Sequence, residues 1–218
     1  MKRYLFSIAC VVFVFCATAQ NNPEETQSPY VFPAFESGTI YFINGDETEK
    51  KLNYNGVTEE MIYLANGRKL AVDNLSEIDK IVIKSRVFIP SDGKFFEKIS
   101  ECQEGPFIRY NYRLEGPEKP SGYGSSSQTT ATTSYTTLTD DKMYYELKLP
   151  ADFKVVRSSS FYFTNGTEWA EVSNKRHAWK LYGNEHKDQI KRFVKKQKIN
   201  FSATEDMVKL GEFLNGLK

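Results

Sequence analysis

The chain from Gly38 to Val172 consists of short runs in which apolar and polar side chains roughly alternate. A period of two is typical of strands that bury one face of a sheet. One phrase, Tyr-x-x-Asn-Gly, begins at Tyr41, at Tyr63 and again at Tyr162. Asn and Gly best tolerate the positive φ angles of a two-residue type I′ turn, so each phrase predicts a hairpin. The copies share no fixed period, which indicates shared turn chemistry rather than a structural repeat.

Other short apolar runs predict the remaining strands. The second arms of the three hairpins are expected at 51–54, 69–72 and 169–172. Further β-branched or aromatic runs occur at 80–84, 86–89, 94–98, 107–114, 143–149 and 160–163. Ser91-Asp92-Gly93 supplies another turn. The spacing of the turns favours an antiparallel meander in a sandwich, roll or small barrel.

The apolar period becomes helical after Asn174. Asn174 and Gly183 bracket a predicted helix over 175–182, as its N-cap and its C-terminal stop. Asn184 is the predicted cap of a second helix, and Ser202 with Glu205 forms the predicted capping box of a third. The apolar stripes of these two longer helices are narrow, so we expect an antiparallel pair that closes over one face of the sheet. The stripe residues are Ile190, Phe193 and Val194, then Met207, Leu210, Leu214 and Leu217.

These patterns predict an α+β protein, in which an antiparallel β meander or roll of hairpins is followed by a C-terminal helical segment packed on the sheet. We expect a signal peptide at 1–19, a polar lead-in arm at 20–37, an antiparallel β domain at 38–174 and C-terminal helices at 175–218. Within the β domain, 17 of the 24 residues from 116 to 139 are Gly, Pro, Ser or Thr. That composition predicts a disordered loop, with an edge strand at 129–137 as the alternative.

The N-terminus has the pattern of a secretory signal. Lys2 and Arg3 precede an apolar run over 5–15, and Ala17-Thr18-Ala19 offers the small residues at which a signal peptidase cleaves, near Ala19. The run is too short to span a bilayer, and no later stretch approaches the required length of about 20 residues. We therefore expect an exported protein, periplasmic or extracellular after cleavage, without a transmembrane segment.

The positions of the cysteines and charges limit the possible disulfides and partners. Cys10 and Cys16 would leave with the signal peptide, so Cys102 would have no intramolecular disulfide partner. Residues 20–174 contain 16 Lys and Arg against 23 Asp and Glu, whereas residues 175–218 contain 11 against 5. The basic tail docks on its own acidic body, is a solvated helix face, or faces anionic lipid or polymer. A net charge near zero argues against nucleic acid as the partner.

No pattern of catalytic residues or metal ligands stands out. His177 and His186 lack the spacing of a zinc site, and the chain has neither a nucleophile elbow nor a phosphate loop. Acidic pairs such as Glu59 with Glu60 are frequent, but their sequence positions do not indicate two carboxylates facing each other across a cleft. We expect no catalytic site, no metal site and no cofactor.

Aromatic and basic residues are the candidates for binding. The chain has 16 Phe, 13 Tyr and 2 Trp, and most of them can fill a β core. Tyr123 and Tyr135 lie in the low-complexity loop and Trp179 on a short helix, where core packing explains them less well. The basic helix adds Lys191, Arg192 and Lys195. Rings of this kind stack on sugars or anchor proteins, so the expected partner is a polysaccharide or another envelope protein.

Four segments carry a family resemblance: Gln20-Asn21-Asn22 after the cleavage junction, the opening 38–42, the segment 119–124 and the tail 190–201. Together they resemble a group of uncharacterised exported proteins of Bacteroidota, over most of the chain beyond residue 19. The resemblance implies a Gram-negative envelope, hence the periplasm or beyond. It implies no activity, ligand or catalytic residue.

Three functional hypotheses follow. The leading one is a non-enzymatic envelope or secreted protein, a binding or structural module whose sheet presents a binding face. The alternative is a hydrolase of envelope glycan or peptide that uses a carboxylate pair. In the third, the basic helix holds the protein at an anionic surface. A cleft that holds His177 or Cys102 beside a carboxylate would contradict the first hypothesis.

Overall fold

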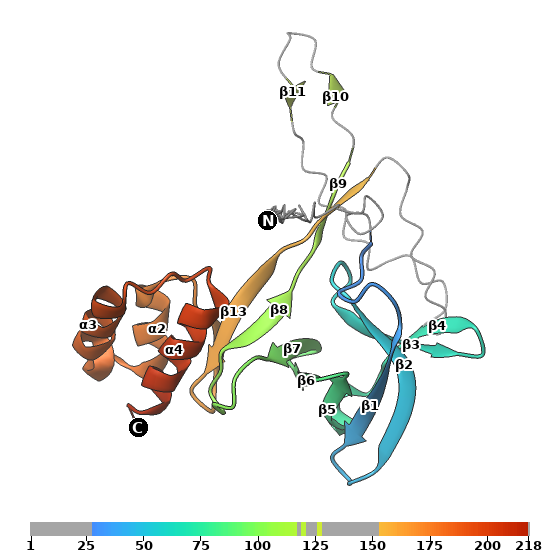
Figure 1. Ribbon diagram of the computed structural model, residues 1–218, viewed down its shortest axis with the longest axis horizontal. Coiled ribbons are helices and arrows are strands. Elements are labelled where there is room, and N and C mark those ends of the chain that lie inside the picture. The colour runs from blue at the N-terminus through green and yellow to red at the C-terminus, as the bar shows by residue number, and fades with distance from the viewer. Residues whose placement is uncertain (1–27, 117–118, 121–125, 128–152, 218) are drawn as a thin grey trace, which may run out of the picture.

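The computed structural model describes residues 28–116, 119–120, 126–127 and 153–217. A ten-stranded antiparallel sheet runs in the order β14-β13-β8-β7-β6-β5-β1-β2-β3-β4. The α-helices gather at the β13 end of this sheet (Figure 1). The prediction of an α+β protein, with a meander of hairpins followed by helices packed on the sheet, is confirmed.

The bounds of the elements follow chain order. The strands of the main sheet are β1 (Glu36–Phe42), β2 (Glu47–Asn55), β3 (Glu60–Ala65), β4 (Arg68–Ala71), β5 (Ile78–Ile83), β6 (Arg86–Ser91), β7 (Lys94–Lys98), β8 (Phe107–Tyr110), β13 (Ser159–Thr164) and β14 (Trp169–Glu171). Two small ribbons pair β9 (Arg113–Glu115) with β12 (Lys154–Val156), and β10 (Lys119–Pro120) with β11 (Ser126–Ser127). The helices are η1 (Leu75–Glu77), α2 (Lys175–Tyr182), η3 (Asn184–His186), α3 (Lys187–Gln197) and α4 (Thr204–Asn215).

All three Tyr-x-x-Asn-Gly phrases form hairpins, but only one has the predicted turn. Asn66 and Gly67, with φ of 52° and 76°, make the two-residue connection of β3 to β4. The β1–β2 and β13–β14 loops contain four residues each, 43–46 and 165–168. There the glycine alone has positive φ, and the Asn side chain accepts a backbone N–H two residues on, at 3.0 Å in both loops. Asn therefore acts through its side-chain oxygen in these two turns.

The predicted strand over 107–114 is broken in two. β8 ends at Tyr110, and β9 leaves the main sheet to pair with β12. Between them, the Tyr112 N–H donates to the Gly56 carbonyl at 2.8 Å, across the fold. A Cβ on Gly56 would lie 2.6 Å from the Tyr112 ring, so only glycine admits this contact. A long-range contact thus overrides a regular local alternation.

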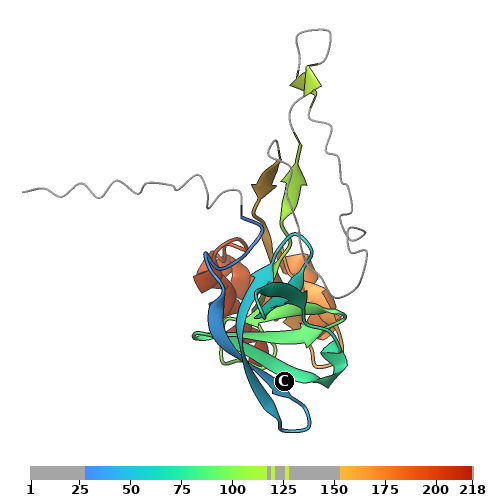
Figure 2. The same ribbon diagram turned by 90° about the vertical axis from the view of Figure 1, so that its right-hand side faces the viewer.

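The main sheet curls until β2 faces β6, β7 and β8. The buried ring of Tyr54 on β2 lies 6.0 Å from Phe88, 6.5 Å from Phe95 and 6.3 Å from Tyr110, measured between ring centroids. Figure 2 shows the sheet end-on, with the curled strands in front of the helices. The enclosed core also contains Phe32, Ile40, Leu52, Met61, Ile78, Ile81 and Ile83.

An ionic clasp closes this curl. Glu59, at the β2–β3 turn, accepts hydrogen bonds from Arg109 Nε and Nη2 at 3.0 and 2.9 Å, and pairs with Lys94 of β7. Arg109 Nη1 also donates to the Tyr162 hydroxyl at 3.0 Å, which extends the clasp to β13. These side chains join the β2–β3 turn to the neighbouring strands β7, β8 and β13, from which the turn is distant along the sheet.

The described part of the lead-in arm packs on the sheet. Phe32 is buried, and its backbone is bound by the buried Asn53 side chain in both directions, at 3.1 and 2.9 Å. Other expected features lie outside the described residues: the signal peptide at 1–19, most of the 116–139 loop with Tyr123 and Tyr135, and the strand at 143–149.

The first predicted helix is confirmed together with its caps, whereas two other predicted caps are wrong. The Asn174 side chain accepts the N–H groups of Arg176 and His177, and α2 stops at Gly183. Asn184 lies inside η3, and α3 begins after it without a side-chain cap. The Ser202–Glu205 capping box does not form, because α4 begins after Ala203 without a side-chain cap. The preceding turn is organised from Asn200 instead, whose side chain binds the Ser202 N–H and whose own N–H binds Asp206.

The helices pack on the β13–β14 hairpin at the end of the sheet, and not as a pair over one of its main faces. Their apolar core contains Phe163, Val172, Leu181, Ile190, Met207, Leu210 and Leu214. The rings of Phe193 and Phe213 stack at 4.0 Å with an interplanar angle of 8°. α4 closely approaches the β7–β8 loop, because a Cβ on Gly211 would lie 2.6 Å from the Gly105 oxygen. Each helix in the described residues is too short or too polar to cross a membrane.

Candidate functional site

The structure brings some of the sequence-predicted binding residues together. Lys191 lies over the Trp179 ring with its Nζ 5.1 Å from the centroid, and Lys187 joins it at 5.4 Å. Lys195 continues the same row one turn further along α3, and Arg192 is displaced from that row by about 100° around the helix. Tyr123 and Tyr135 lie outside the described residues.

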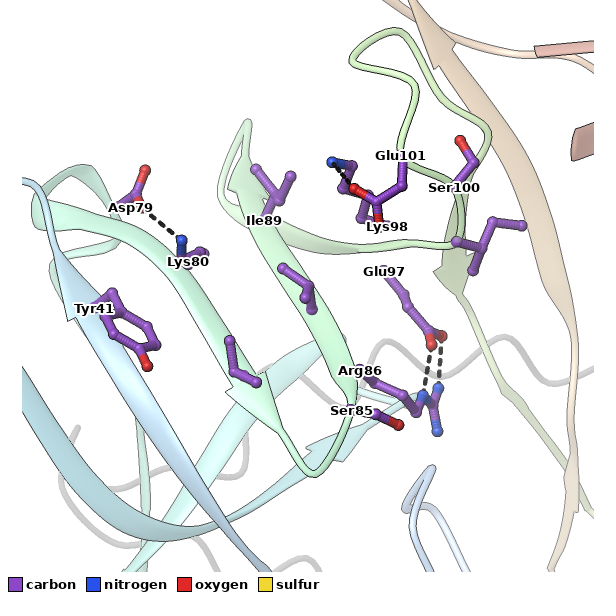
Figure 3. A pocket seen from close by; sticks show the side chains of 13 residues that line it. Tyr41, Asp79, Lys80, Ser85, Arg86, Ile89, Glu97, Lys98, Ser100 and Glu101 are labelled. Carbon is purple, nitrogen blue, oxygen red and sulfur yellow. Dashed lines mark hydrogen bonds and ion pairs between the residues drawn. The ribbon is translucent and has the colours of Figure 1, made fainter. Parts of the chain in front are cut away.

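A second candidate is an open groove of about 990 Å³ beside β5, β6 and β7. Cavities of this size accommodate small ligands or a segment of polymer. Figure 3 shows three charged pairs around it: Asp79 with Lys80, Arg86 with Glu97, and Lys98 with Glu101. Tyr41 lines one side, and aliphatic side chains contribute between the charges.

Strand register explains how these side chains reach the groove. Tyr41 pairs with Lys80, and Val82 with Val87, so these residues share the outer face of the sheet. Arg86 and Glu97 have the other parity, because Arg86 pairs with Ile83 and Glu97 with the core residue Phe88. Arg86 and Glu97 are therefore charged residues on the core face of the sheet. Arg86 begins β6, where a side chain on this face can still reach solvent.

Arg86, Glu97 and Tyr110 form a tightly connected triad. Arg86 Nε and Nη2 donate to the two Glu97 carboxylate oxygens, both at 2.6 Å. Nη2 also donates to the Tyr110 hydroxyl at 2.7 Å, and that hydroxyl donates to Glu97 at 2.5 Å. The guanidinium carbon lies 4.5 Å from the Phe32 ring centroid. Planar, bidentate pairing of this kind holds the arginine in a single orientation.

The surroundings of Arg86 and Tyr110 in the triad raise the pKa of both groups. Burial acts to lower the pKa of Arg86, but the hydrogen bond and charge of Glu97 outweigh it and leave that pKa raised. Burial, then the Glu97 charge and hydrogen bond, raise the pKa of Tyr110. Arg86 therefore stays cationic and Tyr110 stays a neutral donor at ordinary pH.

The charged side chains of the groove differ in how they are engaged. Three acidic and three basic side chains line it, so its charges balance. The Lys80–Asp79 and Lys98–Glu101 pairs are wide, at 3.9 Å, and solvent-accessible, so a ligand can exchange with either partner at little cost. Glu97 is occupied by Arg86 and Tyr110. Arg86 Nη1 has no hydrogen bond to any described residue, which leaves its N–H groups available to an acceptor.

The other titratable candidates lie elsewhere. The residues that line the groove include neither Cys102 nor a histidine. Half-buried Cys102 lies in the β7–β8 loop, and His177 at the start of α2 contacts Ser173 and Asn174. Within the described ranges, no three His, Cys, Asp or Glu side chains are grouped as they would be around a metal ion.

Sequence reasoning missed the triad. The available signal was parity: Arg86 stands two residues before Phe88, and Glu97 two residues after Phe95, so each charge falls on the core-facing side of its strand. A cation and an anion at core-facing positions of two consecutive strands indicate a buried pair. Tyr110 carries no such signal, because a tyrosine at a core position is ordinary.

Comparison with known proteins adds no relative. No protein-family model matches the chain, and no curated protein or solved structure matches it.

Proposed function

We propose that this is an exported, non-enzymatic envelope or secreted protein, and that the groove beside β5, β6 and β7 is its binding surface. The single observation that supports this function is the Arg86 triad. A guanidinium fixed by Glu97 and Tyr110, with spare N–H groups at a groove, is a preorganised donor that loses little entropy on binding. Export is supported by the N-terminal pattern of Lys2, Arg3, an apolar run and Ala17-Thr18-Ala19.

The ligand class that fits the groove best is a neutral polysaccharide. Strands β5, β6 and β7 each have neighbours on both sides, so a peptide cannot bind there by adding a strand. The lining is too polar for an amphipathic helix, has too few aromatic rings for a proline-rich segment, and has no excess positive charge for a phosphopeptide. Sugar hydroxyls both donate and accept, which suits a lining of paired cations and carboxylates around Tyr41 and aliphatic side chains.

Binding to an array of neutral oligosaccharides, followed by titration of any positive probe, tests the proposal. Tyr41→Ala and Lys98→Gln should each weaken binding about tenfold, since each removes one groove contact. The matched controls are Ile43→Ala, at an exposed position in the β1–β2 loop, and Lys50→Gln on β2, neither of which lines the groove. Equal losses in control and groove variants would contradict the assignment of the site, as would the absence of any oligosaccharide that binds.

Two further measurements address export and the absence of catalysis. N-terminal sequencing of the protein recovered from the periplasm or medium should begin at Gln20. Incubation with the bound oligosaccharide should release no new reducing ends. Release that disappears in Glu97→Gln or Glu101→Gln would establish the hydrolase alternative in place of the binding function.

A further inference from the structure

The helical segment at the β13 end of the sheet carries an excess of positive charge. Residues 175–198, which span α2 and α3, contain nine Lys and Arg against two Asp and Glu, a net charge of +7. None of these nine basic side chains forms an ion pair with any described residue. We call the exposed and half-buried basic side chains of α2 and α3 the basic face.

Several of these charges oppose the stability of their own helices. Lys175 and Arg176 occupy the first turn of α2, where the helix dipole favours acidic residues and none is present. Lys187, Lys191 and Lys195 stand four residues apart along α3, a like-charge spacing that destabilises a helix. Folding alone does not account for such placement, whereas an anionic partner would relieve both penalties.

Trp179 lies beneath two lysines of the basic face. It is half-buried against the helical core, and the ammonium groups of Lys187 and Lys191 lie above its ring at 5.4 and 5.1 Å. Tryptophan is enriched where an apolar phase meets charged head groups. Seven of the nine basic residues are lysines, whose compact ammonium groups bind phosphate as point charges.

The arrangement has the dimensions of a contact with an extended surface. The row from Lys187 to Lys195 extends over nine residues of helix, or about 12 Å, so it reaches several anionic groups at once. We propose that the basic face docks the protein on a membrane surface rich in anionic phospholipid, with the row of Lys187, Lys191 and Lys195 at the phosphates and Trp179 at the interface. The groove plays no part in this contact.

Vesicle co-sedimentation of the full chain tests the proposal. Vesicles of phosphatidylcholine alone are compared with vesicles that also contain about a third phosphatidylglycerol. The wild-type protein should bind the anionic vesicles and release them steeply as salt rises. The triple variant Lys187→Gln/Lys191→Gln/Lys195→Gln should lose roughly 100-fold in affinity, because each lysine near an anionic surface contributes about fivefold. Binding through the N-terminus, where Lys2 and Arg3 also favour anionic vesicles, would be the same in the wild-type protein and in the triple variant.

Two matched variants separate this contact from general charge and from misfolding. Lys50→Gln/Lys51→Gln/Lys154→Gln removes the same charge from β2 and β12 and should retain most of the binding. Replacing the three α3 lysines with arginine keeps the charge and should also retain it, while circular dichroism reports that each variant remains folded. Equal binding of the two kinds of vesicle, or equal loss in both glutamine triples, would overturn the proposal. Binding to soluble dextran sulfate without binding to anionic vesicles would overturn it in favour of an anionic polymer.

Discussion

The curled sheet and the helical cluster both bury an apolar core, yet they treat charge in opposite ways. In the sheet, Arg86 and Arg109 lie among aromatic rings and are neutralised by Glu97 and Glu59. In the helical cluster the core consists of aliphatic and aromatic side chains, and the basic side chains of α2 and α3 form no ion pair with any described residue. Lys209 of α4 pairs with Asp206 at the surface, at 3.1 Å. Buried ionic contacts therefore belong to the architecture of the sheet, whereas the charges of the basic face remain available to a partner.

The largest expected effect is the loss of the sheet's internal cation. Arg86→Met would remove the cation that pairs with the buried Glu97 carboxylate and would leave that carboxylate with the Tyr110 hydroxyl as its remaining donor in the triad, so it should lower the free energy of unfolding by about 3–5 kcal/mol. Urea denaturation measures this change in the free energy of unfolding. Arg86→Met/Glu97→Met removes both charges and should regain much of the loss. A single variant within about 1 kcal/mol of wild type would show that the triad does not stabilise the sheet.

A smaller effect is expected where the helices meet the sheet. The Cβ of Gly211→Ala would lie 2.6 Å from both the Gly105 oxygen and Pro106 Cδ. The overpacking should cost about 1–3 kcal/mol, again measured by urea denaturation. Gly216→Ala is the matched control, because its Cβ would approach no atom closer than 3.5 Å. If both substitutions cost the same, the close approach of Gly211 to the β7–β8 loop does not determine the result.

The free energy of unfolding should depend on pH through Glu60, which begins β3 next to the clasp residue Glu59. The expected change is intermediate to small in size. Burial raises the pKa of Glu60, so the folded state retains the Glu60 proton more tightly than the unfolded chain does. This contribution is most favourable below the ordinary pKa of 4.5 and is lost as pH rises through the raised value. Glu60→Gln should therefore gain stability relative to wild type across that window. Urea denaturation at a series of pH values measures this gain, with the exposed Glu49→Gln as control. The same dependence of the free energy of unfolding on pH in both variants would contradict the prediction.

The smallest expected effect on stability comes from the lysines at the two ends of α2. Lys175→Gln removes a cation from the first turn of α2 and should stabilise the protein by about 0.3–1 kcal/mol at low salt. Lys180→Gln removes a cation from the last turn and should destabilise it by a similar amount. Thermal unfolding at low and high salt measures both changes. The same sign for the two substitutions would contradict the helix-dipole argument.

Local chemistry predicted the parts of the fold that depend on neighbouring residues. Asn174 and Gly183 define α2 because their roles need only adjacent backbone groups. The break of the strand after Tyr110 could not be predicted from the sequence, because it depends on Gly56, more than fifty residues earlier in the chain. The groove likewise requires knowing that β1 returns beside β5, which brings Tyr41 to Lys80. The pairing of Trp179 with Lys191 needed only the packing of consecutive helices, and sequence named both residues.

The outermost strands of the main sheet bear on self-association. β14 has three residues and β4 has four, whereas β2 has nine. An unpaired strand is a template on which another chain can polymerise, and the hazard grows with its length. These short outer strands offer an incoming strand few backbone groups for hydrogen bonding. The exposed Arg68 and Lys69 on β4 also repel a second copy of the same strand. Both features disfavour fibril growth through the two outer strands of the sheet that the structure describes.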